Sequence, residues 1–171
     1  AFLQKPISAN DLIDTLMILC QNSIGRVSVL RESYAKPFER ALQQGIFSLI
    51  GVHSEVEMEV DDSNFLNVSG IAVIIGLTGS PTGRAIVSMD SETMHRFSMI
   101  MLDKDSPAAV SEEDASETVE ESANIIVGRG ISNINDVFKD KEVRITPPGT
   151  IVGTNIRIAS PKLTTFRIVA K

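Results

Sequence analysis

The sequence predicts an α+β domain in which a largely antiparallel sheet packs against two long helices. Three observations lead to this fold class. Apolar residues recur at helical spacing over residues 37–50 and 112–134. Alternating or continuous apolar runs mark strands between and after these two helices. The order of helix, three strands, two helices and further strands lacks the regular strand–helix alternation of a parallel sheet.

The N-terminal part of the chain stands apart from this domain. Ser8 can cap a helix that ends near residues 22–25, and the mixed residues 26–35 predict a connector or a short strand. The other elements follow from the apolar pattern and from the turn residues that bound it. In chain order they are a helix at 37–50, strands at 55–60, 69–77 and 85–89, helices at 91–102 and 112–134, and strands near 143–145, 150–158 and 163–169.

The composition excludes several classes of function. A single cysteine, Cys20, allows no intramolecular disulfide, and the two distant histidines, His53 and His95, form no metal-binding pair. The net charge of −6 disfavours nucleic acid as a partner. No apolar run approaches the roughly 18 residues that span a bilayer, and no signal-peptide pattern opens the sequence. We therefore expect a cytoplasmic protein that binds neither membrane nor nucleic acid.

The helix at 112–134 has two contrasting faces. Its apolar and small residues gather on one face, which we expect to be buried: Ala115, Val119, Ser122, Ala123, Ile126, Val127, Gly130 and Ile134. The opposite face carries Glu117, Glu121, Asn124 and Gly128. Glu121 and Asn124 are i and i+3 neighbours, and Gly128 leaves room for a partner one turn further on. The spacing alone is more typical of a solvated acidic face with one ordinary asparagine.

The segment Glu121-Ser122-Ala123-Asn124-Ile125-Ile126-Val127-Gly128 resembles the E-x-x-N-x-x-x-G helix of the CheC/CheX chemotaxis phosphatases. That family continues with a proline after 22 intervening residues, and Pro147 matches. Glu117 stands where the family usually has Asp or Ser. CheC-type members carry a second motif, but here Leu42 occupies the matching position of the earlier helix. The chain therefore looks more like CheX, which has one site per subunit and acts as a homodimer.

The start of the chain shows a second resemblance. Ala1-Phe2-Leu3-Gln4-Lys5-Pro6-Ile7 is similar to the last strand of a response-regulator receiver domain, in which Lys-Pro is a hallmark. We therefore expect residues 1–34 to be a receiver-tail-like strand and helix with a linker, and residues 35–171 to be a CheX-like domain. The chain would then be the C-terminal piece of a longer receiver fusion. An ordinary extra helix is the alternative interpretation.

The resemblance implies a phosphatase that acts on the aspartyl phosphate of a phosphorylated receiver. It implies that the carboxamide of Asn124 orients the attacking water and that Glu121 pairs with the receiver's lysine. Glu117 and Gly128 would contribute to docking, and Pro147 would shape the adjoining strand. The chain itself would bind no cofactor, because the receiver would bring its own Mg²⁺.

Two alternatives remain open. Flagellar-switch proteins share the fold but lack the motif, so a non-catalytic receiver-binding or structural module is one of them. An enzyme that uses Glu121 and Glu117 as an acid–base pair is the other, and it would give a bell-shaped pH–rate profile. Exposed sheet edges make strand pairing a plausible basis for the expected homodimer.

Overall fold

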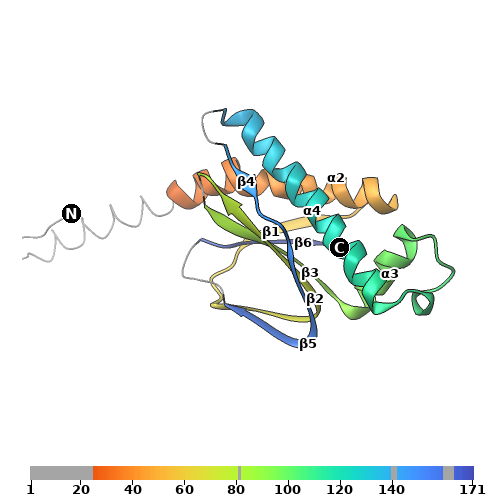
Figure 1. The fold of residues 1–171 in the computed structure, drawn as a ribbon. Helices are drawn as coiled ribbons and strands as arrows, with labels where there is room; N and C mark the ends of the chain where they lie inside the picture. The colour runs from red at the N-terminus through yellow and green to blue at the C-terminus, as the bar shows by residue number, and fades with distance from the viewer. Residues whose placement is uncertain (1–24, 81, 140–141, 160–163) are drawn as a thin grey trace, which may run out of the picture.

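The computed structural model describes residues 25–80, 82–139, 142–159 and 164–171. The receiver-like strand and helix expected before residue 25 lie outside the described residues. The remainder confirms the predicted α+β class and the largely antiparallel sheet (Figure 1). Its helices and strands also follow one another in the predicted order.

The first described segment is helical, so the predicted connector at residues 26–35 is wrong. Residues 25–30 are helical and continue through the π-helical turn η1 (Arg31–Ala35) into α2 (Lys36–Ile50). The helix ends at Gly51, which has a left-handed φ of 72° and closes the last turn. The predicted division between residues 34 and 35 falls inside this segment and stays a prediction.

Contacts with distant parts of the chain explain why residues 31–35 are helical. The ring of Tyr34 stacks on Phe138 with the ring centroids 5.4 Å apart. Ala35 is buried, and Arg31 donates a hydrogen bond to the carbonyl oxygen of Met58. Tertiary contacts of this kind override a weak local preference, and the local sequence pattern does not reveal them.

The main sheet is built around the long central strand β2 (Phe65–Thr78). β2 pairs antiparallel with β3 (Gly83–Asp90) along one edge. Along its other edge it pairs antiparallel with β4 (Arg144–Ile145) and with β5 (Gly149–Ala159). β4 and β5 therefore behave as one strand that is interrupted between residues 145 and 149.

A second, two-stranded sheet pairs the first described strand with the last one. β1 (Val56–Val60) pairs antiparallel with β6 (Phe166–Ala170), with Met58 opposite Ile168. Backbone hydrogen bonds between Glu55 and Lys171 extend this pairing beyond the strands. We refer to β1 and β6, with the flanking Asp61 and Lys171, as the β1–β6 ribbon.

The described residues also form the helices α2, α3 (Ser91–Met101) and α4 (Glu112–Val137), with a short 3-10 helix η2 (Pro107–Ala109) before α4. α2 and α4 lie side by side on one side of the main sheet (Figure 1). The main apolar core lies between the helices and β2, and includes Ile71, Val73, Ile75, Met94, Phe97, Val119, Val127 and Ile134. A smaller cluster of Val68, Ala72 and Ile158 contains residues of β2 that alternate with this core.

The buried face of α4 agrees with the prediction. All eight residues expected on it are buried, and Ile131 joins them. α2 packs closely against this face, because a Cβ atom on Gly45 would lie 2.6 Å from Ile126 and one on Gly130 would lie 2.5 Å from Phe38. Glycine at these two positions lets the helices approach each other, which leaves only the remaining side of α4 for a partner.

Candidate functional site on helix α4

The start of α4 is fixed by a reciprocal cap. The hydroxyl of Ser111 accepts a hydrogen bond from the backbone N–H of Asp114 at 3.0 Å and donates one to its carboxylate at 2.8 Å. Glu112 and Glu113 in the first turn are favoured by the positive end of the helix dipole. The cap sets where the helix begins and therefore which residues share each face.

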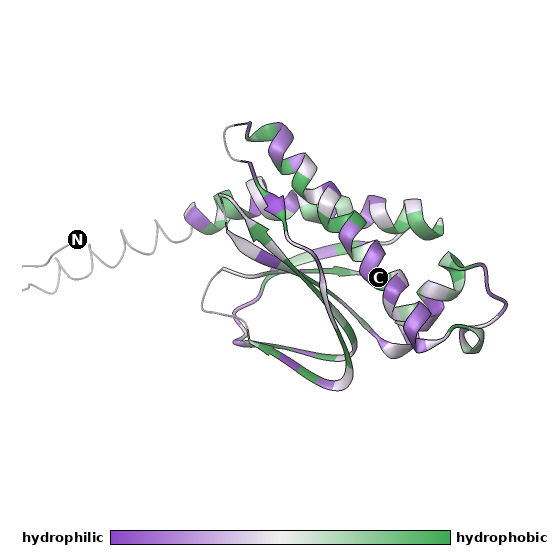
Figure 2. Ribbon diagram, viewed as in Figure 1, coloured by the Kyte–Doolittle hydropathy of each residue, from purple (hydrophilic) through white to green (hydrophobic). Residues whose placement is uncertain are grey.

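The four residues predicted for the opposite face lie where the spacing places them. Glu117 and Glu121 are exposed, whereas Asn124 and Gly128 are half-buried. A Cβ atom on Gly128 would meet no other atom within 4 Å, so the space beside it is open. Figure 2 shows that the N-terminal half of α4 presents mainly hydrophilic residues to the viewer. We refer to these four residues as the outer face of α4.

The polar side chains of the outer face have no partner within the described part of the chain. The carboxamide of Asn124 makes no hydrogen bond to any described residue, so both its oxygen and its NH₂ group can serve a ligand. No ion pair joins Glu117 or Glu121 to a basic group of residues 25–80, 82–139, 142–159 or 164–171. An amide thus lies beside two exposed carboxylates, a set that can orient water and attract a cation.

Pro147 lies in the interruption between β4 and β5 and is exposed. Helix α4 contacts both of these strands, so the corner that contains Pro147 borders the helix. No hydrogen bond links Pro147 to the four predicted residues of the outer face among the contacts of the described chain. Its expected role in shaping the strand stays a prediction.

Sequence reasoning missed one residue that links this corner to the helix. The half-buried Glu120 accepts a hydrogen bond from the hydroxyl of Thr150, the second residue of β5. The side chain of Glu120 therefore faces the sheet, while the neighbouring Glu121 faces outward. The helical spacing places Glu121 but not Glu120 on the outer face, and the partner of Glu120 is known only once the position of β5 is known.

The two histidines are not on α4, and each contacts a residue close to itself in the sequence. Nδ1 of His95 is 2.8 Å from the carbonyl oxygen of Ser91, one turn earlier in α3. His53 stacks on Phe47 with the ring centroids 4.3 Å apart. The described residues contain no group of His, Cys, Asp and Glu that could hold a metal ion. None of the described helices is long and apolar enough to cross a membrane.

Comparison with known proteins gives one family and several similar structures. The family model described as chemotaxis phosphatase CheX matches residues 71–170, which is more than half of the chain. A CheX structure from Desulfovibrio desulfuricans is 21% identical, with a TM-score of 0.71 over 81% of this chain and 90% of that chain. A CheX–CheY–BeF3–Mg²⁺ complex from Borrelia burgdorferi is 28% identical, with a TM-score of 0.57 over 69% and 75%. No curated protein matches the chain in sequence.

A second CheX structure, from Vibrio vulnificus, shows how far the fold persists. It is only 14% identical, yet it has a TM-score of 0.68 over 81% of this chain and 90% of that chain. The arrangement of helices and antiparallel strands is therefore that of the CheX structures. The matched residues 71–170 also contain the whole of α4 and its outer face. The chain belongs to the chemotaxis phosphatase family CheX.

Proposed function

We propose that this chain hydrolyses the aspartyl phosphate of a chemotaxis response-regulator receiver domain, and that Asn124 orients the attacking water. The observation that carries the proposal is the carboxamide of Asn124. It is half-buried, has no hydrogen-bond partner among the described residues, and lies on the outer face of α4. In a member of a phosphatase family, such an amide is a suitable group to hold a water molecule.

In the proposed reaction this chain forms no covalent bond with the substrate. The oxygen of water bonds to phosphorus, the bond between phosphorus and the aspartyl oxygen breaks, and the products are a free carboxylate and inorganic phosphate. Phosphoryl transfer depends mainly on positioning and on charge stabilisation. The oxygen of Asn124 would accept a hydrogen bond from the water and so align it with the phosphorus. Mg²⁺ and a lysine on the receiver would stabilise the phosphoryl oxygens.

Glu121 would fix the receiver in place. Its carboxylate is exposed one turn before Asn124 and lacks a basic partner within the described residues. An ion pair with the receiver's lysine would set the distance between the phosphoryl group and Asn124. Glu117 would add to the attraction, and the open space beside Gly128 would admit the partner's surface. The Borrelia burgdorferi structure, which contains CheX together with CheY, supports a receiver as the partner.

We also propose that the chain acts in the cytoplasm as a homodimer. β5 is an edge strand that pairs with β2 and with no other described strand. Ile151 and Val152 on it are 44% and 39% exposed. Exposed apolar residues on an unpaired strand edge favour pairing with another chain. Sedimentation analysis tests this directly, with a dimer expected and a monomer at high concentration as the contrary result.

Phosphate release from a phosphorylated receiver tests the catalytic proposal. Asn124→Ala should slow release by about 10² or more, which is typical for the loss of a positioned catalytic group. Asn133→Ala is a matched control, because Asn133 is an exposed asparagine on the same helix outside the outer face. The control should release phosphate at the wild-type rate. Equal rates for all three proteins would overturn the role of Asn124.

The same assay separates the two other candidate functions. A binding or structural module would leave the receiver's own rate of phosphate loss unchanged. An acid–base pair of Glu117 and Glu121 would give a bell-shaped pH profile that is lost when either residue becomes Gln. The amide mechanism requires neither carboxylate to gain or lose a proton, so Glu117→Gln should keep the wild-type profile.

A further inference from the structure

The corner between β4 and β5 interrupts the regular pairing of these strands with β2. Pro147 and Pro148 have no backbone N–H, so neither can donate to the neighbouring strand. The regular pairing with β2 accordingly stops after Ile145 and resumes at Gly149. Two threonines, Thr146 and Thr150, make hydrogen bonds at the two ends of this corner.

Thr146 secures the first end of the corner. Its backbone N–H donates to the carbonyl oxygen of Gly76 at 2.9 Å, and its hydroxyl oxygen accepts from the N–H of Gly76 at 3.0 Å. A Cβ atom on Gly76 would lie 2.9 Å from that hydroxyl oxygen, so glycine allows the close approach. Thr146 thus forms hydrogen bonds with both the N–H and the carbonyl oxygen of Gly76, next to the point where the prolines interrupt the pairing.

At the second end of the corner, Thr150 contacts α4 as well as the sheet. Its hydroxyl donates a hydrogen bond to the carboxylate of Glu120. Glu120 precedes Asn124 by four residues, so the two side chains are neighbours on one side of the helix. The hydrogen bond therefore joins the corner to the same turn of α4 that carries the proposed water-orienting amide.

We propose that Glu120 and Thr150 are positioning residues for this reaction, which rests on the proposed function. Their hydrogen bond would hold the exposed corner around Pro147 at a fixed distance from Asn124 and thereby define the space in which the phosphoryl group and water meet. Neither side chain touches the substrate. Their loss should therefore lower turnover and leave receiver affinity unchanged, because Glu117 and Glu121 remain on the outer face.

Thr150→Val is the first test, because valine keeps the branched shape and the strand preference but lacks the hydroxyl. We expect kcat to fall about tenfold, since misplacement by about 1 Å can cost on the order of 10²-fold and the strand pairing of β5 limits the movement. KM for the phosphorylated receiver should stay within about twofold. Thr150→Ser, which keeps a hydroxyl, should restore kcat.

Variants of Glu120, which accepts the hydrogen bond from Thr150, provide a second, independent test. Glu120→Gln keeps an oxygen that can accept from Thr150, whereas Glu120→Ala does not. We expect Glu120→Gln to have nearly wild-type kcat and Glu120→Ala to match Thr150→Val. The double variant that combines Glu120→Ala with Thr150→Val should be no slower than either single variant, because all three lack the same hydrogen bond.

Asn124→Ala, measured in the same series, keeps the two proposals distinguishable. If it retains the wild-type rate, the proposed function is wrong and the positioning role falls with it. If it is slow while Thr150→Val retains wild-type kcat, only the positioning role is wrong. A rise in KM as large as the fall in kcat, or additive losses in the double variant, would also overturn it and indicate a general structural role.

Discussion

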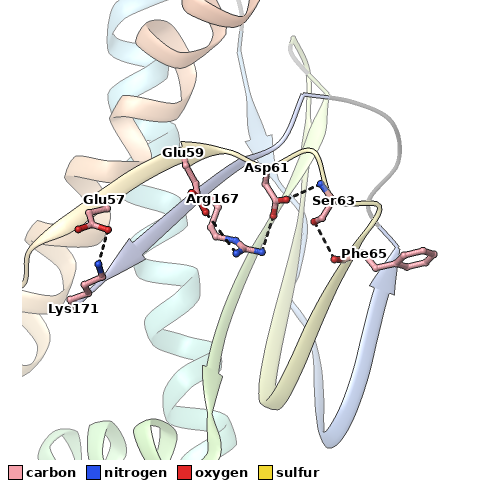
Figure 3. Close-up of polar contacts among 7 residues, drawn as sticks. All are labelled: Glu57, Glu59, Asp61, Ser63, Phe65, Arg167 and Lys171. Atoms are coloured by element: carbon pink, nitrogen blue, oxygen red, sulfur yellow. Dashed lines mark hydrogen bonds and ion pairs between the residues drawn. The ribbon is translucent and has the colours of Figure 1, made fainter.

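The β1–β6 ribbon and the outer face of α4 both carry acidic residues, but the two regions use them differently. In the ribbon the carboxylates have basic partners, as Figure 3 shows. Nζ of Lys171 lies 2.7 Å from a carboxylate oxygen of Glu57. The guanidinium nitrogens of Arg167 lie 3.0 Å from a carboxylate oxygen of Asp61 and 3.8 Å from one of Glu59. On α4, Glu117 and Glu121 have no such partner within the described residues.

Three glutamates of α4 that have no basic partner within the described residues repel one another along the helix. Glu113, Glu117 and Glu121 follow one another at intervals of four residues, and like charges at this spacing repel by about 0.2–0.5 kcal/mol per pair. The helix dipole compensates in the first turn but does not reach Glu117 or Glu121. Six of the 22 acids lie between residues 112 and 121, a number equal in size to the net charge of −6. The ribbon's charges therefore pair within the chain, whereas Glu117 and Glu121 are available to a partner.

Among the variants that compare these two regions, the largest effect on receiver binding is expected for Glu121→Ala. Loss of this carboxylate should weaken binding of the phosphorylated receiver about tenfold, through the lost ion pair. Glu59→Ala in the ribbon is the matched control, because it removes an exposed glutamate whose partner lies within the chain. Titration of a phosphorylated receiver measures both. Equal weakening by the two variants would remove the distinction between the regions.

A charge reversal at Glu117 should separate stability from docking. Lys at this position would replace two repulsions, with Glu113 and Glu121, by two attractions, and so raise the unfolding free energy by about 1 kcal/mol. The same change should weaken receiver binding, because one docking acid has become a base. Chemical denaturation and receiver titration on the same sample measure the two effects. A destabilised variant, or one that binds more tightly, would contradict this interpretation of the outer face.

A smaller effect, on stability alone, is expected in the ribbon. Hydrogen bonds from Ser63, and then the guanidinium of Arg167, hold the pKa of Asp61 below its ordinary value. A lowered folded-state pKa stabilises the fold above the ordinary carboxyl pKa, and this stabilisation is lost as pH falls through the folded-state value. Asp61→Asn should therefore be less stable than wild type near neutral pH and approach it in acid. Denaturation midpoints between about pH 7 and about pH 2 test this.

Phosphate release serves as the control for that variant. Asp61→Asn should keep wild-type activity near neutral pH, because Asp61 pairs within the ribbon and lies outside the outer face of α4. A stability difference that is the same at every pH would show that the charge of Asp61 is not its cause. A loss of activity without a loss of stability would place the ribbon in the functional site.

The sequence predicts α4 well because the helix is long and its pattern is regular. One period of 3.6 residues assigned all eight of the expected core residues and also the four of the outer face. Pro147 could be found only through the resemblance, since its distance from Asn124 in sequence carries no structural meaning by itself. A local pattern therefore predicts which residues share one face of a helix or strand. It does not predict which distant residues contact that face.

The features that the sequence did not predict all depend on distant contacts. The helix at residues 31–35 relies on Phe138, which is about a hundred residues away in the chain. The role of Glu120 depends on Thr150, which reaches α4 only because β5 returns along β2. Pairing between β1 and β6 joins the first and the last described strands, which are far apart in the sequence. Such contacts follow from topology, which local periodicity does not encode.

The most direct test of the central claim is a single-turnover measurement with the chain in excess over a phosphorylated receiver. At saturation the rate reports the chemical step and is independent of binding. We predict that Asn124→Ala saturates at the same concentration as wild type but reaches a maximal rate about 10² or more lower. A maximal rate within about twofold of wild type would show that Asn124 does not orient the water, and the amide mechanism would be wrong.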